Sequence, residues 1–131
     1  MTKPVIDHIG IIVNDLVSSV ERLKPIFGDA ITYRHLPEEG LKVAEFETQN
    51  LIIELLQYEG AAEFARDVMG ELSGLSHITV KVDDVSESLS DLAAQGFQPQ
   101  AGFPRKGAHG QIAFLKRDDE TNLLMEICEA G

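Results

Sequence analysis

The chain has 131 residues, the usual size of one domain, and its hydrophobic fraction of 44% is typical of a globular protein rather than a disordered one. Asp and Glu outnumber Lys and Arg by 22 to 11, which gives a formal net charge of −11. Because such an acidic surface repels phosphate backbones and anionic lipids, we expect neither a nucleic-acid partner nor a membrane partner. No secretory signal is visible, and the single cysteine, Cys128, excludes an intrachain disulfide, so we expect a cytoplasmic protein.

Two parts of the sequence repeat each other. The segment 7–16 matches the segment 76–85 at an offset of 69 residues, which places His8 on His77 and Asp15 on Asp84. A second pair of segments, 51–56 and 123–128, matches at an offset of 72 residues. The sequence therefore predicts one domain built from two modules, about 1–58 and 74–131, joined by a link over about 59–73 that contains a short helix at 61–70.

The elements expected in the first module begin with a strand, because Ile9, Ile11 and Val13 alternate along one face. A helix is predicted from Leu16 to Phe27, followed by strands over about 30–35, 41–48 and 51–57. The second module predicts the same order. Its first strand holds His77, and its helix starts at Asp84, which has capping-box spacing to Glu87, and ends at Gly96. Three strands then follow, over about 98–102, 111–116 and 122–128. The repeated order β-α-β-β-β predicts an α+β fold.

Each module carries a His on its first strand and a Glu on its last strand. The pairs are His8 with Glu54, and His77 with Glu126. Both Glu residues stand between apolar neighbours, and a carboxylate in such a place is costly unless it is paired or bound to a metal. Imidazole and carboxylate together suit Zn, Fe, Co, Ni or Mn. The four residues therefore predict a site for one divalent metal ion, as opposed to four unrelated packed side chains.

These residues and motifs resemble those of the vicinal oxygen chelate superfamily, which includes glyoxalases, bleomycin-resistance proteins and dioxygenases. Within it, the chain is most similar to methylmalonyl-CoA epimerases. The similarity is clearest in Ile6-Asp-His-Ile-Gly-Ile-Ile-Val, Pro37-Glu-Glu-Gly and Pro104-Arg-Lys-Gly-Ala-His-Gly. The resemblance implies two βαβββ modules that form a curved mixed-sheet cup around the metal. It also places His8, Glu54, His77 and Glu126 at the ligand positions.

The resemblance implies an epimerase or isomerase that acts through an enolate, with a CoA thioester as the substrate and a homodimer as the assembly. Glu126 would serve as ligand and base. Two alternatives stay open: a glyoxalase I-type lactoylglutathione lyase, and a metal-free protein of the same fold that binds drugs or other small molecules. A ring-cleaving dioxygenase is a weaker alternative, because such enzymes generally use two His and one Glu.

Some positions differ from the epimerase pattern or carry several interpretations. Val43 stands where some epimerases have a second catalytic carboxylate, whereas Glu45, two residues later on the same strand face, is either a second acid or base or a solvated residue. An anionic CoA substrate requires a local basic patch. The candidates are Arg105 and Lys106, with Lys116 and Arg117 nearby, and His109 is a candidate for the lining of the pocket. The segment 118–122, which is glycine-rich in epimerases, is acidic here.

Overall fold

The computed structural model describes residues 2–107 and 110–129, and the chain divides into two compact units. Residues 8–76 form the first, which we call the N-terminal unit. Residues 77–129, together with residues 2–7, form the second, which we call the C-terminal unit. Two strands, 5–12 and 74–82, cross these bounds, and most of the first lies in the N-terminal unit and most of the second in the C-terminal unit.

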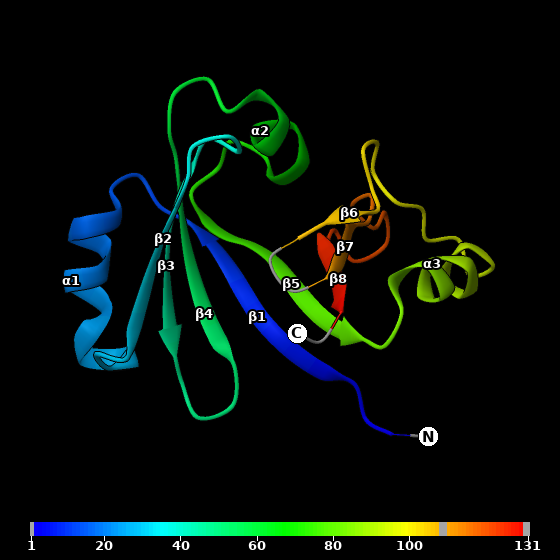
Figure 1. Ribbon diagram of the computed structural model, residues 1–131, viewed down its shortest axis with the longest axis horizontal. Helices are drawn as coiled ribbons and strands as arrows, with labels where there is room; N and C mark the ends of the chain where they lie inside the picture. The colour runs from blue at the N-terminus through cyan, green and yellow to red at the C-terminus, as the bar shows by residue number, and fades with distance from the viewer. Residues whose placement is uncertain (1, 108–109, 130–131) are drawn as a thin grey trace. The chain divides into compact units, whose positions relative to one another are not determined.

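The N-terminal unit contains a four-stranded mixed sheet with the order β2-β3-β4-β1 (Figure 1). Strand β1 is parallel to β4, and the other neighbours are antiparallel. The predicted helix and strands are present within one or two residues. The elements are β1 (Val5–Ile12), α1 (Leu16–Phe27), β2 (Ile31–Leu36), β3 (Leu41–Glu47), β4 (Ile52–Tyr58) and the linking helix α2 (Glu63–Met69).

The C-terminal unit repeats this pattern. Its strand order is β5-β8-β7-β6, with β5 parallel to β8 and the other neighbours antiparallel. The predicted α+β class and the repeated βαβββ order are thus confirmed. The elements are β5 (Gly74–Val82), α3 (Val85–Ala93), β6 (Arg105–Lys106), β7 (Gln111–Phe114) and β8 (Met125–Glu129).

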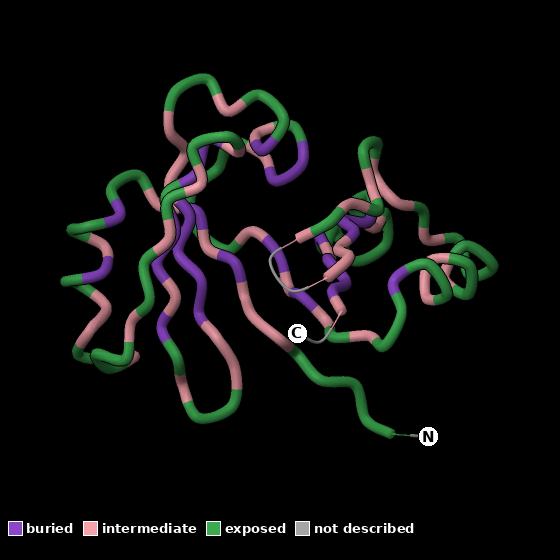
Figure 2. The backbone as a smooth tube through the Cα atoms, viewed as in Figure 1, coloured by how far each residue is buried: buried purple, intermediate pink, exposed green. Residues whose placement is uncertain are grey.

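In each unit a helix covers one face of the sheet, and the apolar residues of alternate strand positions pack beneath it. The core under α1 comprises Leu16, Val20, Ala44, Phe46, Ile53 and Leu55. The smaller core beside α3 is built around Val85, Ala113 and Ile127. Buried positions follow β3 and β4 in particular (Figure 2). Because successive strand residues point to opposite faces, the polar residues between these apolar ones lie on the face of each sheet opposite the helix.

The predicted strand over 98–102 is wrong. Pro99 forms only an isolated bridge with Leu115, and the segment contains no strand. The backbone N–H of Gln100 still donates to the Phe114 carbonyl at 2.8 Å, but the chain then turns, and the N–H of Phe103 donates back to the Gln100 carbonyl at 3.3 Å. The strand that pairs with β7 is instead β6, at Arg105–Lys106.

The first turns of α1 and α3 are capped from the last strand of their own units. The N–H of Leu16 donates to the Gln57 side chain at 2.7 Å, and the N–H of Val85 donates to the Glu129 carboxylate at 3.0 Å. Gln57 and Glu129 are related by the 72-residue offset of the repeat. The Asp84 cap is confirmed as well, since its carboxylate accepts a hydrogen bond from the N–H of Glu87.

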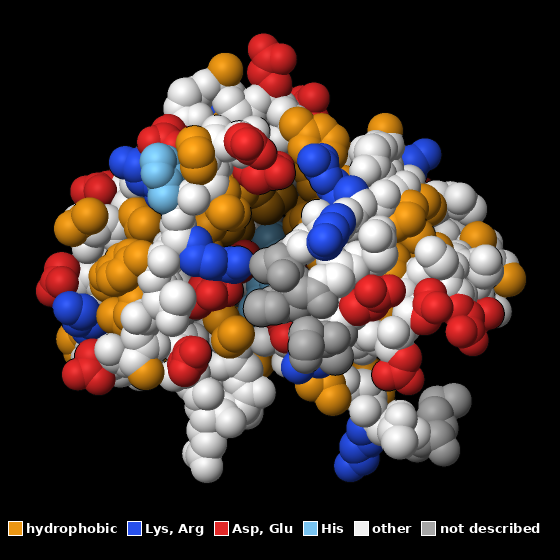
Figure 3. All heavy atoms as spheres, viewed as in Figure 1, with side chains coloured by type: hydrophobic (Ala, Val, Ile, Leu, Met, Phe, Trp, Pro, Cys, Tyr) orange, Lys and Arg blue, Asp and Glu red, His pale blue; other side chains and the backbone are white. Residues whose placement is uncertain are grey.

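Within the described residues, no helix is both long enough and apolar enough to cross a membrane. Acidic side chains are scattered over the visible face of the molecule and interspersed with Lys and Arg (Figure 3).

Candidate metal centre

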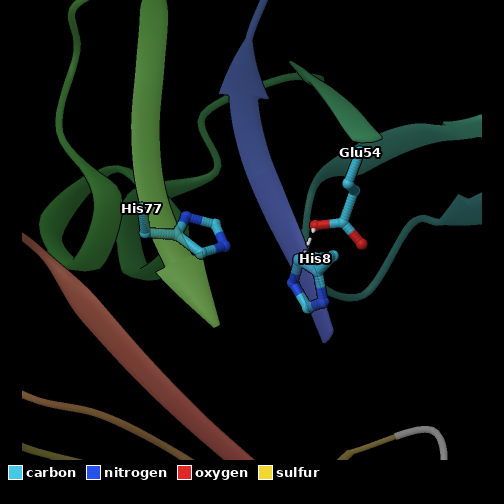
Figure 4. Close-up of side chains that lie close together, drawn as sticks. All are labelled: His8, Glu54 and His77. Atoms are coloured by element: carbon cyan, nitrogen blue, oxygen red, sulfur yellow. Dashed lines mark ion pairs between the residues drawn. The ribbon is translucent and has the colours of Figure 1, made fainter. Parts of the chain in front are cut away.

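The first candidate pair lies in the N-terminal unit. Ile53 and Leu55 point into the core under α1, so Glu54 between them points to the opposite face of the sheet. His8 lies on the neighbouring strand β1, and its Nε2 is 3.6 Å from Glu54 Oε1 (Figure 4). The two side chains are largely buried, with exposed fractions of 13% and 10%.

The second pair lies in the C-terminal unit with the same arrangement. Ile127 packs in the core beside α3, so its neighbour Glu126 points to the opposite face of the sheet. His77, on β5, also drawn in Figure 4, has its Nε2 3.6 Å from Glu126 Oε1, and both residues are buried. The ring of Phe114 meets the His77 ring edge to face, with the centroids 4.9 Å apart, which fixes the plane of the imidazole.

The donor atoms of each pair suit a divalent metal ion. Two ligands about 2.1 Å from a shared ion are about 3.0 to 3.5 Å apart at ordinary coordination angles. The separation of 3.6 Å in both pairs is close to that range and longer than an ordinary hydrogen bond. Each unit thus offers one imidazole and one carboxylate to a metal, from residues that the sequence had singled out.

The two candidate ligand carboxylates have different neighbours. The Cα partner of Glu126 on β5 is Thr79, whose fully buried hydroxyl donates to Glu126 Oε1 at 2.6 Å. At the equivalent place in the N-terminal unit, the partner of Glu54 is Gly10, which has no side chain to donate. The guanidinium of Arg34 approaches Glu54 instead, at 3.6 Å. One carboxylate is therefore supported by a neutral donor and the other by a cation.

Glu45 lies on β3 directly across from Glu54 and is not a solvated strand residue. Its side chain is 17% exposed, and its Oε2 accepts a hydrogen bond of 2.9 Å from Arg34 Nη2. Of the two interpretations that the sequence allows for Glu45, the solvated residue is excluded, because Glu45 lies among the other polar groups on the face of the N-terminal sheet opposite α1. A role as acid or base stays a prediction.

The predicted substrate-binding residues fall partly in the described part of the chain. Arg105 and Lys106 form β6, whereas His109 lies outside the described residues. Lys116 is exposed. Arg117 is engaged locally, because its Nη1 donates to the Asn122 carbonyl at 2.8 Å.

The acidic segment before β8 forms a tight turn. The Asp118 carboxylate accepts hydrogen bonds from the N–H and the hydroxyl of Thr121, and these bonds hold the pKa of Asp118 below its usual value. Asn122 has a φ of +60°, a conformation that Asn tolerates better than most residues. The turn thus reaches β8 without the glycines that epimerases carry at this place.

Two βαβββ units, each with a buried His–Glu pair on its strands, define the chain as a protein of the vicinal oxygen chelate fold. The model of the Glyoxalase/Bleomycin resistance protein/Dioxygenase superfamily matches residues 7–114, and the chain belongs to this superfamily.

Two relatives and one similar solved structure are named methylmalonyl-CoA epimerase. The mitochondrial methylmalonyl-CoA epimerases of Mus musculus and Dictyostelium discoideum are 25% and 27% identical, over 95% of this chain and 72% and 77% of their own lengths. A solved methylmalonyl-CoA epimerase in complex with methylmalonyl-CoA and ammonium has a TM-score of 0.76 and 26% identity, and covers 99% of this chain and 96% of its own. A hypothetical protein from Bacillus halodurans has a TM-score of 0.81 and 27% identity, with the same coverage.

Two polar neighbours of the candidate ligands were missed from the sequence. Arg34 follows no motif, and its role depends on cross-strand register that the sequence alone does not fix. Thr79 was within reach of prediction, because it stands two residues after His77 and therefore on the same strand face.

Proposed function

We propose that the chain is a metal-dependent epimerase that acts on a CoA thioester of the methylmalonyl-CoA type. The observation that carries this proposal is the buried His–Glu pair, repeated in both units with the same 3.6 Å separation. It is supported by the similarity to proteins named methylmalonyl-CoA epimerase, which extends over 95% or more of the chain.

In this proposal four residues together hold one divalent ion: His8, Glu54, His77 and Glu126. This donor set accepts Co, Ni, Zn, Mn or Fe, so the ligands do not select one metal. When bound, such an ion polarises substrate oxygens and stabilises the negative charge of an enolate. The two carboxylates balance the charge of a divalent ion, which favours its binding in a buried place.

The reaction requires that a proton leaves C2 of the acyl group from one face and returns to the other. We assign the first step to Glu126, which the Thr79 hydroxyl holds in place. We assign the second step to Glu45, which Arg34 holds in place and which must take up a proton from solvent before it can return one to the other face of C2. Arg105 and Lys106 of β6, with His109, would bind the anionic CoA portion, because the rest of the chain is acidic. The homodimer and the cytoplasmic location stay predictions.

The test is hydrogen exchange at C2 of methylmalonyl-CoA. The protein, loaded with cobalt and incubated with methylmalonyl-CoA in deuterated water, is expected to exchange the C2 hydrogen for deuterium, as followed by mass spectrometry. Glu126→Gln should slow the exchange by at least about a hundredfold, because a general base contributes roughly that much or more to such a step. Glu47→Gln is the matched control, because Glu47 is an exposed carboxylate on β3. This variant should catalyse the exchange at the rate of the wild type.

An absence of exchange by the cobalt-loaded wild type would contradict the proposal. If the same preparation instead turned over the hemithioacetal of methylglyoxal and a thiol, the activity would be that of a glyoxalase-type lyase. If it neither retained a metal nor turned over either substrate but bound small molecules, the chain would belong to the metal-free binding proteins of this fold.

A further inference from the structure

Arg34 on β2 joins two carboxylates of the N-terminal unit. Its Nη2 donates to Glu45 Oε2 at 2.9 Å and lies 3.6 Å from Glu54 Oε2. Glu45 and Glu54 are direct partners on β3 and β4, and like charges at such positions repel each other. The guanidinium therefore offsets a repulsion that the sheet register creates.

The position of the Arg34 side chain is set by these carboxylates. Its Nε is buried and has no hydrogen-bond partner among residues 2–107 and 110–129. A buried N–H without an acceptor is unfavourable, so the contacts of Nη2 must outweigh this cost to hold the guanidinium where it is. The three groups also carry a net charge of −1, which favours a cation over an anionic ligand at this place.

The C-terminal unit lacks this arrangement. Arg105 on β6 is the counterpart of Arg34 on β2. Arg105 pairs with a residue of β7 and Arg34 with a residue of β3, and these two residues pair in turn with equivalent positions of β8 and β4. At the register of Glu45, however, the C-terminal unit has the aromatic ring of Phe114. The N-terminal unit thus has the carboxylate of Glu45 directly across from the candidate ligand Glu54. The C-terminal unit has Phe114, and no carboxylate, directly across from the candidate ligand Glu126.

We propose that Arg34 is a positioning residue that keeps Glu45 from binding the metal and thereby sets the affinity of the centre for divalent cations. The inference rests on the proposed function, in which Glu54 is a ligand. Without Arg34, the uncompensated charge beside the ion would be greater, and the Glu45 carboxylate would be available as a further ligand. With Arg34, Glu45 stays available for proton transfer, and a coordination position stays open for substrate oxygens.

The test is the dissociation constant for Co²⁺, measured at one pH by isothermal titration calorimetry on the wild type, four variants at Arg34 and Glu45, and two controls. Arg34→Gln should bind Co²⁺ more tightly than the wild type, by about tenfold, because it removes a cation close to the ion. Glu45→Gln should bind about tenfold more weakly, because Arg34 then acts on Glu54 alone. The double variant should return to within about threefold of the wild type, since the two changes oppose each other.

Two controls separate this effect from changes in overall charge. Lys42→Gln and Glu47→Gln change the same charges at exposed positions of β3, and neither should change the constant more than about twofold, because exposed charges are screened. Arg34→Lys keeps the positive charge and should stay within about threefold of the wild type. It also serves where Arg34→Gln does not fold, as judged by circular dichroism.

The order of the affinities of these variants for Co²⁺ tests the role proposed for Arg34. A weaker constant for both Arg34→Gln and Glu45→Gln would overturn the inference, because a residue needed only for local structure would weaken binding whichever partner is removed. Where Arg34→Gln does not fold, two other results would overturn the inference. One is an affinity of Arg34→Lys for Co²⁺ that differs from the wild type by more than about threefold, and the other is an affinity of Glu45→Gln that is no weaker than that of the wild type. A wild type that binds no Co²⁺ would overturn the proposed metal centre itself, which is a different result from bound metal with the wrong order.

Discussion

The Thr79 hydroxyl donates a 2.6 Å hydrogen bond to the Glu126 carboxylate, and both residues are buried on the face of the C-terminal sheet opposite α3. Thr79→Val keeps the shape of the side chain and removes this donor. We expect a loss of about 1–3 kcal/mol in the free energy of unfolding, since the carboxylate keeps its burial and loses a partner. Urea denaturation measures this, with Thr79→Ser as the variant that keeps the hydroxyl. A valine variant as stable as the wild type would show that the bond contributes little.

The cap on α1 comes from Gln57, which accepts the Leu16 N–H, and Glu129 does the same for α3. Gln57→Ala should lower the free energy of unfolding by about 1 kcal/mol, the usual effect of losing a cap. Gln57→Glu should not, because Glu129 shows that a carboxylate fits the equivalent place and a negative charge is favourable at a helix N-terminus. Thermal melts of the two variants check this. If the glutamate variant melted lower than the alanine variant, the equivalence of the two caps would be wrong.

Substitutions at Gly28 and Gly40 separate two contributions to the free energy of unfolding: backbone conformation and side-chain packing. Gly28 and Gly40 both have positive φ, +88° and +70°, but an added Cβ at Gly28 meets nothing within 4 Å. At Gly40 it would lie 2.7 Å from the Cβ of Ala62. Gly28→Ala should therefore cost about 1–3 kcal/mol in the free energy of unfolding for its conformation alone, since φ +88° with ψ −171° is a region that glycine occupies almost exclusively. Gly40→Ala should cost clearly more. The two urea midpoints give the comparison, and equal losses would contradict the close approach of Ala62.

Tyr58 gives the fold a dependence on alkaline pH. Its hydroxyl donates to the Gly70 carbonyl at 2.5 Å, and burial first, then the charge of Glu71, raises its pKa to about 12, while Arg66 acts in the opposite direction. Because the pKa in the folded protein lies above the ordinary value near 10, ionisation favours the unfolded chain. This contribution to stability is complete below pH 10 and is lost as the pH rises from about 10 to about 12.

The measurement is the phenolate absorbance of Tyr58 in a Tyr33→Phe background, where no other tyrosine contributes. We expect a midpoint near pH 12 for the folded protein. Tyr58→Phe should remove this part of the pH dependence of unfolding. A midpoint near pH 10 in the folded protein would mean that the phenol is not buried as the structure has it.

The internal repeat of the sequence predicted more of the fold and of the candidate site than composition or charge did. Matching His8 to His77 identified both candidate pairs, because the same residue types recur at equivalent places on strands. The predicted strand at 98–102 is wrong, since the chain turns after Gln100 and ends the pairing that the repeat suggested. Arg34 was beyond the sequence, because its contact with Glu54 depends on strands far apart in the chain. The comparison of Gly10 with Thr79 shows the general limit: equivalent positions share a place in the fold, but their side chains differ.

The central claim is that the two His–Glu pairs hold a single divalent ion. Native mass spectrometry of the intact chain after loading with Co²⁺ and removal of excess metal counts the bound ions directly. We predict one ion per chain in the wild type, and its loss in both His8→Ala and His77→Ala. A wild type with no retained ion, or one whose ion survives the loss of either histidine, would contradict the claim.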